Sequence, residues 1–398
     1  MKPDITLIFP DSPFLITKNM FPPLGIMYLS AFLKQKGLEV QCLDVGGLGH
    51  TIDMVEADTV GISITTPQRD SAFEIARHLK EQGKTLIAGG PHASHMASEC
   101  YDDGFDCVIN GYGEACLYRL FNFEQSGINP PIDELPYPDR DCLPIKEYEQ
   151  YIDGRPATVL MASRGCPYNC SFCANIKAKF EMQSAERTLA ELFYVQEKYG
   201  YTAFTLYDDT FAISKKRLKI MADALENKDF RFRCFCRSDL LSDDICGDFA
   251  RMGMDTIGIG IESGSDVILK RNMKGLSVAE STRAIKNLRK HGILSKAFLI
   301  VGLPGETHET VQETMAWIEN AKPDDIAVSI FQPLPGSDVF NNPDKYGVEF
   351  IYDGQPLWYR GKPGKYVANV ATEGLSPEEI VRYRDILETT YKPKELLK

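Results

Sequence analysis

Short apolar runs alternate with amphipathic segments along most of the chain. In the first third, the apolar runs predict strands at residues 5–9, 40–44, 59–64, 85–90 and 107–109. Between the first two runs, Ile26, Leu29 and Leu33 recur at helical spacing. Pro23 and Gly37 fit the first turn and the C-terminal cap of that helix. Strands that alternate with helices predict a doubly wound parallel sheet, whose binding crevice lies at the carboxyl ends of its strands.

A second alternating series begins at residue 157. Its predicted strands lie at residues 157–162, 203–209, 231–237, 256–261, 297–302 and 325–331. Six strand-helix units are fewer than the eight of a closed barrel, so we expect a partial (β/α)6 barrel with one open side. The pattern divides the chain into a first α/β domain, a proline-rich linker, the barrel and a C-terminal cap with a final helix, at residues 1–127, 128–156, 157–340 and 341–398.

Composition narrows the classes of protein that the chain can represent. Its 398 residues carry a formal net charge of -12, which argues against a nucleic-acid partner because phosphate binding needs clustered Lys and Arg. No apolar run approaches the roughly 18 to 20 residues of a membrane span, and the first residues lead directly into a strand pattern. We therefore expect a cytoplasmic protein, and the 11 cysteines fit a reducing compartment better than a disulfide framework.

Three cysteines gather in the loop that follows the first barrel strand. Cys166, Cys170 and Cys173 have a C-x3-C-x2-C spacing at the carboxyl end of a buried strand, where parallel α/β proteins place their chemistry. Three sulfurs do not complete a tetrahedral zinc site, and ordinary ferredoxin clusters take four cysteines. The spacing therefore favours a cluster with one open metal corner over a zinc knuckle or a set of buried cysteines.

With Phe172 directly before its third cysteine, this loop resembles the cluster loop of the radical S-adenosylmethionine (SAM) enzymes. The resemblance implies a four-iron four-sulfur cluster on Cys166, Cys170 and Cys173, whose fourth iron is chelated by the amino and carboxylate groups of SAM. One electron from the cluster would then release a 5'-deoxyadenosyl radical. The cofactors would supply this chemistry, and the protein would orient them and exclude water.

The resemblance also assigns SAM contacts at the strand ends, to Phe172, Asp208, Asp209, Arg237, Glu262, Ser263, Ile300 and Gly302. Asp208 and Asp209 would lie near the amino group, and Arg237 would bind the carboxylate as a charge-assisted fork. Glu262 and Ser263 would face the ribose, and Ile300 and Gly302 would lie at the adenine. From the residues alone, the two aspartates could instead cap the next segment, and Arg237 could form a surface pair with Asp239.

The first domain resembles the cobalamin-binding domain that precedes the barrel in a large subgroup of this family. Ser63, Gly89 and Gly90 match positions where the corrin and its nucleotide tail approach the backbone. Many such domains supply a cobalt-binding histidine from a D-x-H-x-x-G motif after the first strand. The corresponding loop here, at residues 10–14, contains no histidine, so cobalamin would have no histidine lower ligand from it.

These features predict a cobalamin-dependent radical SAM methyltransferase that acts on an unactivated carbon of a small molecule. A reductant such as flavodoxin or ferredoxin would be its protein partner. The main alternative is a radical enzyme of the same architecture that performs a dehydration, epimerisation, cyclisation or rearrangement, and a non-catalytic iron-sulfur protein is a third. Substrate specificity is expected in the loop at 10–21, the barrel interior and the region of Trp358.

Overall fold

A computed structural model describes residues 2–12, 15, 17–122, 129–174, 179–351 and 366–393 of the chain. The chain forms two compact units, each of which is described by itself below. The first contains Met1–Gln150 and Ile176–Gln183, and the second contains Tyr151–Asn175 and Ser184–Lys398. The division after Gln150 falls inside the segment that the sequence analysis assigned to the interdomain linker.

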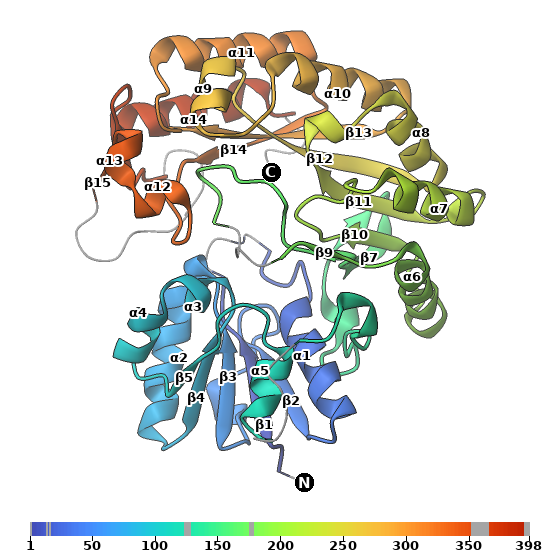
Figure 1. Cartoon of the computed structure of the whole chain (residues 1–398), viewed down its shortest axis with the longest axis vertical. Helices are drawn as coiled ribbons and strands as arrows, with labels where there is room; N and C mark the ends of the chain where they lie inside the picture. The colour runs from blue at the N-terminus through green and yellow to red at the C-terminus, as the bar shows by residue number, and fades with distance from the viewer. Residues whose placement is uncertain are drawn as a thin grey trace. The chain divides into compact units, whose positions relative to one another are not determined.

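The first unit is built on a five-stranded sheet in the order β2-β1-β3-β4-β5 (Figure 1). All of its neighbouring strands are parallel. The strands are β1 (Ile5–Phe9), β2 (Val40–Asp44), β3 (Thr59–Ser63), β4 (Thr85–Gly89) and β5 (Cys107–Val108). The helices are α1 (Leu24–Gln35), α2 (Arg69–Glu81), α3 (Pro91–His95), α4 (Ala97–Asp102) and α5 (Glu114–Arg119). This strand order is flavodoxin-like and places the switch point between β1 and β3.

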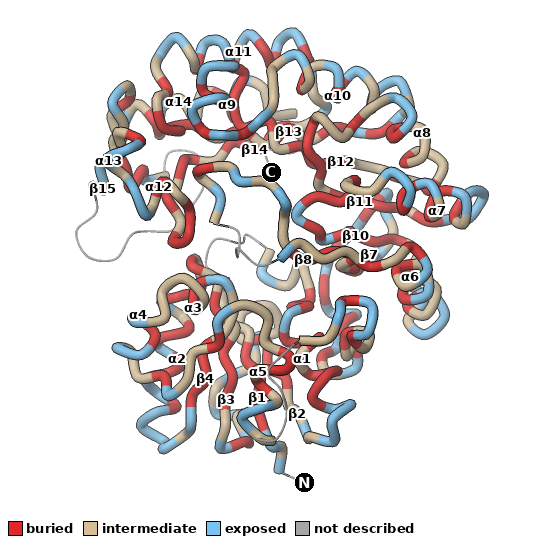
Figure 2. The backbone as a smooth tube through the Cα atoms, in the orientation of Figure 1, coloured by how far each residue is buried: buried red, intermediate tan, exposed pale blue. Residues whose placement is uncertain are grey.

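Two separate apolar clusters cover the two faces of this sheet. On one face, Ile8 and Val60 pack with Phe73 of α2. On the other, Leu7 packs with Ile26 and other residues of α1 and α5. Because neighbouring residues of a strand point to opposite faces, Leu7 and Ile8 belong to different clusters. Figure 2 shows the buried residues concentrated along β3 and β4, and the prediction of a doubly wound sheet is confirmed.

The proline-rich segment packs within the first unit up to Gln150. Its Asp139 accepts a hydrogen bond from Ser30 Oγ at 2.6 Å and donates its N–H to the carbonyl oxygen of Met27 at 3.0 Å. Short turns lie at η3 (Ile132–Glu134) and η4 (Ile145–Glu147). Ile132 and Leu135, at η3, pack against Phe32 of α1. The segment is therefore tied to the first helix by both polar and apolar contacts.

The second unit contains a curled sheet in the order β14-β13-β12-β11-β10-β7-β6. Its parallel strands are β7 (Arg155–Leu160), β10 (Ala203–Leu206), β11 (Arg231–Cys236), β12 (Met254–Glu262), β13 (Leu294–Val301) and β14 (Asp325–Ile330); β6 (Tyr151–Ile152) is antiparallel to β7. The helices that follow the outer side of the sheet in Figure 1 are α7 (Lys215–Leu225), α8 (Asp243–Arg251), α10 (Val278–Lys290) and α11 (His308–Ala321). The prediction of a partial barrel with six parallel strands is confirmed.

The helices of this unit have the bounds α6 (Ala185–Tyr199), α7 (Lys215–Leu225), α8 (Asp243–Arg251), α9 (Asp266–Arg271), α10 (Val278–Lys290), α11 (His308–Ala321), α12 (Asp338–Asn341), α13 (Pro343–Tyr346) and α14 (Pro377–Tyr391). Short strands lie at β8 (Ser163–Arg164), β15 (Val348–Phe350) and β16 (Val370–Thr372), and β9 (Glu181–Met182) belongs to the first unit. The sequence predicts a final helix, and Ser376 caps α14 in a capping box with Pro377 at its start. Trp358 lies outside the described residues.

Residues of the barrel strands alternate between the helix-covered face and the inner face. Cys234 and Cys236 of β11 are buried, and Phe235 between them lies on the inner face. Its ring packs in a tilted arrangement against Phe298 of β13, at 5.9 Å between centroids, and edge-to-face against Tyr207 after β10, at 6.3 Å. The inner face thus carries an aromatic layer close to the carboxyl ends of its central strands.

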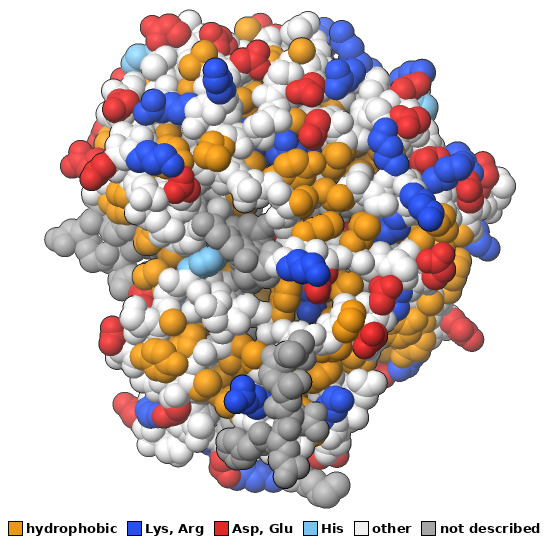
Figure 3. Space-filling view, in the orientation of Figure 1, with side chains coloured by type: hydrophobic (Ala, Val, Ile, Leu, Met, Phe, Trp, Pro, Cys, Tyr) orange, Lys and Arg blue, Asp and Glu red, His pale blue; other side chains and the backbone are white. Residues whose placement is uncertain are grey.

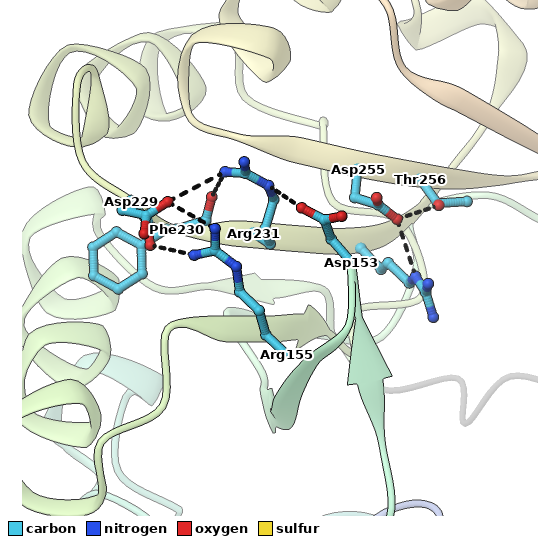
Figure 4. Close-up of polar contacts among 8 residues, drawn as sticks. Asp153, Arg155, Asp229, Phe230, Arg231, Asp255 and Thr256 are labelled. Carbon is cyan, nitrogen blue, oxygen red and sulfur yellow. Dashed lines mark hydrogen bonds and ion pairs between the residues drawn. The ribbon is translucent and has the colours of Figure 1, made fainter.

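Ion pairs close the amino-terminal ends of these strands (Figure 4). Arg231 at the start of β11 donates from Nε to Asp153 at 2.9 Å, and Arg155 at the start of β7 pairs with Asp229 at 2.9 Å. The backbone carbonyl oxygen of Phe230 accepts a further bond from Arg231 at 2.8 Å. This end of the sheet is therefore joined by polar contacts between loops, and the opposite end is left for chemistry.

The described helices give no candidate for a membrane span, because none is both long and apolar enough. On the face seen in Figure 3, Lys and Arg side chains are interspersed with Asp and Glu. The described side chains on that face form no continuous basic surface. This distribution agrees with the excess of 56 acidic over 44 basic residues in the sequence.

Candidate active site

The three-cysteine loop follows β7 in the second unit. Cys166 and Cys170 are half-buried and Cys173 is exposed. Burial raises the pKa of the Cys166 thiol, and the nearby Asp209 carboxylate raises it further. Within the described residues, no three His, Cys, Asp or Glu side chains converge as a metal site. The loop nevertheless offers three thiols within eight residues, which is the donor set that an iron-sulfur cluster takes.

Asp208 holds the start of this loop. Its carboxylate accepts the Ala162 N–H at 2.7 Å and the Ser163 hydroxyl at 2.8 Å, and Arg217 Nη2 lies 3.7 Å from it. Burial raises the Asp208 pKa to about 6, although Arg217 and the hydrogen bonds oppose this change. Both carboxylate oxygens are thus occupied by groups of the chain, whereas Asp209 is exposed beside Cys166. Of the two predicted acids, Asp209 is the one placed toward the thiols.

Ser171 fixes the middle of the cysteine loop. Its N–H and its hydroxyl both donate to the carbonyl oxygen of Asn272 at 3.1 Å, and its own carbonyl accepts the Val339 N–H at 3.1 Å. The Asn272 side chain is fully buried and donates to the carbonyl oxygens of Ile268 and Pro304, each at 3.0 Å. One asparagine therefore connects the cysteine loop to the loop after β13. Neither residue was predicted, because no motif marks either of them.

Arg237, at the end of β11, lies against the same loop. Its Nη1 is 4.0 Å from the Cys170 sulfur, Nη2 donates to the carbonyl oxygen of Gly275 at 3.3 Å and Nε donates to Asp239 at 3.2 Å. Its guanidinium carbon lies 3.7 Å from the centroid of the Tyr168 ring. The predicted pair with Asp239 exists, but Arg237 is buried. The side chain is therefore part of the site rather than of the surface.

Glu262 ends β12 in a left-handed conformation, with φ at 66°. Its carboxylate pairs with Lys274 at 2.6 Å, and both side chains are buried. A Cβ atom on Gly260 would lie 2.5 Å from Glu262 Oε1 and 2.9 Å from Lys274 Nζ, so glycine leaves the space that this pair fills. Lys274 Nζ also lies 5.9 Å from the Phe172 ring centroid. The pair therefore links the end of β12 to the cysteine loop.

Ser263 points to a helix rather than to the open end of the sheet. The side chain is buried, and its Oγ lies 3.3 Å from Thr314 Oγ1 of α11. It also accepts the Ser265 N–H at 3.2 Å. The hydroxyl that was predicted to face a ribose is therefore engaged in packing α11 against the turn.

The turn after β13 depends on a buried acid. Gly302 has φ at 90°, and its N–H donates to Glu306 Oε2 at 2.6 Å. A Cβ at Gly302 would lie 2.9 Å from Ile380 of α14. Burial raises the Glu306 pKa to about 8, although the N–H groups of Gly302 and Leu303 favour the ionised form. Ile300 is half-buried two residues before this turn, on the same face as Phe298.

In the first unit, the residues predicted for cobalamin lie at the carboxyl ends of β3 and β4. Ser63 and Gly89 are paired neighbours in the sheet, and both are half-buried. A Cβ atom on Gly89 would meet nothing within 4 Å, so the backbone there borders open space. Gly90 has φ at 92° and packs closely against the backbone of Ile64. This edge has the open glycine backbone that a large planar ligand requires.

The neighbouring His92 is not turned toward a ligand. It is buried, with Nδ1 3.2 Å from Thr66 Oγ1 and Nε2 3.1 Å from Glu99. Both ring nitrogens are therefore satisfied within the first unit. The loop after β1 is described only in part, because residues 13, 14 and 16 lie outside the described residues.

Two family models match the chain, one in each unit. The B12 binding domain model matches residues 17–121, and the Radical SAM superfamily model matches residues 160–318. The first match begins after β1 and covers the other four strands of the parallel sheet, and the second runs from the end of β7 into α11. Both cover the predicted sites described above.

Several curated proteins are similar to the chain over most of its length. An uncharacterized methyltransferase from Pyrococcus horikoshii is 28% identical, over 84% of this chain and 81% of its own. The anaerobic magnesium-protoporphyrin IX monomethyl ester cyclase of Rubrivivax gelatinosus is 24% identical, over 80% and 66%. The bacteriochlorophyllide d C-8(2)-methyltransferase of Chlorobaculum tepidum is 25% identical, over 85% and 81%. The relatives thus include both methylating and cyclising enzymes.

Among solved structures, the radical SAM methyltransferase TsrM from Kitasatospora setae, solved with cobalamin and a [4Fe-4S] cluster, has the same fold. The TM-score is 0.71 at 16% identity, over 89% of this chain and 82% of TsrM. This likeness agrees with the strand orders of the two units and with the two family models. The chain therefore belongs to the radical SAM superfamily and carries a B12 binding domain before its radical SAM domain.

Proposed function

We propose that the protein is a cobalamin-dependent radical SAM methyltransferase that acts on an unactivated carbon of a small molecule. One observation carries the proposal: a single chain contains a B12 binding domain with an open glycine edge and a radical SAM domain with a three-cysteine loop. When bound, the cluster and SAM would supply a carbon-centred radical, and cobalamin would supply methyl transfer.

Cys166, Cys170 and Cys173 are the proposed ligands of the cluster. Three thiols leave one iron for SAM, which is the reason that a three-cysteine loop suits this chemistry. Asp208 does not touch the cofactors in this proposal. It fixes the Ala162–Ser163 turn from which the loop departs.

For SAM, the geometry favours some of the predicted contacts over others. Asp209 is exposed next to Cys166 and is the proposed partner of the amino group. Glu262 is the proposed ribose contact, and Lys274 holds its carboxylate in place. Ile300 and the turn at Gly302 border the proposed adenine site, with Phe172 nearby. Ser263 acts indirectly, because its hydroxyl is turned toward α11.

For cobalamin, the proposed contacts are Ser63, Gly89 and Gly90. The open space at Gly89 supports a close approach of the ligand to the backbone. The absence of histidine at residues 10–14 means that this loop supplies no histidine ligand to cobalt. His92 supplies none either, because both of its ring nitrogens are paired.

The cyclase relative supports a second candidate function, in which the radical chemistry ends without methyl transfer. Two methyltransferase relatives, each of which matches this chain over 81% of its own length, favour methylation. We also propose a small-molecule substrate and a flavodoxin or ferredoxin reductant. A reducing, cytoplasmic location is supported by the 11 cysteines, a number that fits a reducing compartment better than a disulfide framework.

The experiment that tests the proposal is anaerobic cofactor loading. The cluster is reconstituted, hydroxocobalamin is added, the protein is desalted, and the visible spectrum reports the retained corrinoid. We expect one corrinoid per chain, and 5'-deoxyadenosine on addition of SAM and dithionite. Production of 5'-deoxyadenosine without corrinoid retention would favour the non-methylating candidate, and a chain that cleaves no SAM would be a non-catalytic iron-sulfur protein.

Gly89→Val sharpens this test, since the added Cβ atom would enter open space at the sheet edge, with no other atom of the chain within 4 Å. We expect loss of corrinoid retention with unchanged iron content. Thr85→Val is the matched control, because Thr85 is exposed at the opposite end of the same strand. Equal corrinoid retention by both variants would contradict the assignment of the Gly89 edge.

A further inference from the structure

The contacts of Arg237 go beyond the carboxylate role that the family resemblance implies. Its two terminal nitrogens point to different groups of the chain, the Cys170 sulfur and the carbonyl oxygen of Gly275. Nε is held by Asp239. A guanidinium anchored at all three nitrogens has a fixed orientation, so its contact with the sulfur is a fixed feature of the site.

The face of the same guanidinium holds a second residue of the cysteine loop. The Tyr168 ring lies 3.7 Å from its central carbon, within the distance of close stacking. Tyr168 lies between Cys166 and Cys170 in the sequence. One side chain on β11 therefore fixes the first half of the loop through its plane and contacts a cysteine sulfur through its edge.

We propose that Arg237 is a positioning residue for the cluster, which places the Cys170 sulfur and makes the cluster easier to reduce. The inference rests on the proposed function, because it requires a cluster on Cys166, Cys170 and Cys173. Hydrogen bonds to the sulfurs and nearby charge set the reduction potential of iron-sulfur clusters. Reduction adds a negative charge, so a cation beside a sulfur ligand stabilises the reduced state and raises the potential.

The chain offers a matched control on the same strand. Arg233 lies four residues before Arg237 on β11, about 13 Å away along the strand, and therefore on the same face. It pairs with Asp255 at 3.4 Å and donates to the carbonyl oxygen of Tyr151 at 3.0 Å. Arg233→Met thus removes the same charge from the same face without a contact to the cysteine loop.

The test compares wild type, Arg237→Lys, Arg237→Met and Arg233→Met after anaerobic reconstitution. Iron and sulfide content, the rate of iron release to a chelator and the midpoint potential by EPR-monitored titration are measured without SAM. We expect Arg237→Met to release iron about tenfold faster, from loss of one charge-assisted hydrogen bond. The midpoint potential of Arg237→Met should be more negative than that of wild type, and the potential of Arg237→Lys should lie between these two. The midpoint potential of Arg233→Met should match that of wild type.

A wild-type potential in Arg237→Met, or an equal shift in Arg233→Met, would overturn the proposal. If Arg237→Met takes up no iron, Arg237→Lys decides: a potential below that of wild type supports the proposal, and an unchanged one rejects it. A wild-type protein that binds no cluster rejects the proposed function itself. Because SAM is omitted, loss of a SAM carboxylate contact cannot produce any of these shifts.

Discussion

Two buried acids at the carboxyl end of the barrel differ in how their charge is compensated. Asp208 receives two hydrogen bonds and has Arg217 beside it, and its pKa rises only to about 6. Glu306 receives backbone N–H groups alone, and its pKa rises to about 8. Both pKa shifts arise from burial, and at Asp208 the Arg217 cation opposes the shift. The turn after β13 is therefore more sensitive to pH than the turn after β7.

This contrast predicts a pH-dependent effect of Glu306→Gln. Since the folded pKa of Glu306 is raised, its contribution is fully present below the unfolded value and is lost as pH rises through about 8. From about pH 4.5 to 8, wild type should lose on the order of 4 kcal/mol relative to the variant. Urea unfolding of both proteins across this range measures the difference, and a difference that is constant with pH would contradict the burial of an ionisable group.

Cys170→Ala tests whether this cysteine is a ligand of the cluster. We expect loss of iron binding and of 5'-deoxyadenosine production, while circular dichroism remains unchanged because Cys170 is only half-buried. Cys246→Ala on α8 is the control, since this buried thiol lies outside the loop. The Cys246→Ala variant should bind iron fully, although the loss of its buried thiol lowers the free energy of unfolding. Production of 5'-deoxyadenosine by the Cys170 variant would rule out its role as a ligand.

Among the elements, the loop after α9 connects three others through Asn272. Asn272→Ala removes the side-chain donor of the Pro304 carbonyl oxygen, whereas the Ile268 carbonyl oxygen keeps the backbone N–H of residue 272. We therefore expect a loss of about 1 to 3 kcal/mol in the free energy of unfolding. Faster iron release should accompany it, because the Asn272 side chain anchors to Pro304 the turn whose backbone carbonyl oxygen holds Ser171.

Asn287→Ala provides the comparison for this prediction. Asn287 donates to the carbonyl oxygen of Leu241 at 2.8 Å, from α10 and away from the cysteine loop. Its loss should lower stability without a change in iron release. If both variants release iron at the wild-type rate, the loop after α9 has no part in holding the cluster.

Much of the element order follows from local pattern alone. Apolar runs predicted the strands, helical periodicity predicted the helices, and Pro23 and Gly37 marked where the first helix begins and ends. The cysteine loop was equally visible, because its signal lies in consecutive residues. The roles of Asp208, Asn272 and Arg237 were not predictable, since each depends on side chains that meet across loops far apart in sequence. The spacing of residues along the chain does not predict such contacts.

At the scale of the whole molecule, each unit has its own sheet and core, so ligands should stabilise them separately. Hydroxocobalamin at 100 times its dissociation constant should add about 2.7 kcal/mol to the first unit. Calorimetry should therefore show a rise in the unfolding temperature of one transition only. The shift should vanish in Gly89→Val and persist in Thr85→Val; a shift of equal size in both variants would show that the ligand binds elsewhere.

The first unit is discontinuous: it combines the residues up to Gln150 with a second stretch, of which β9 is the described strand. A single cut at residue 150 therefore does not yield the complete unit. A chimera that exchanges the amino-terminal domain of one relative for another at that junction leaves β9 behind in the recipient. An exchange must therefore carry both stretches to preserve the native interface of β9 with η3.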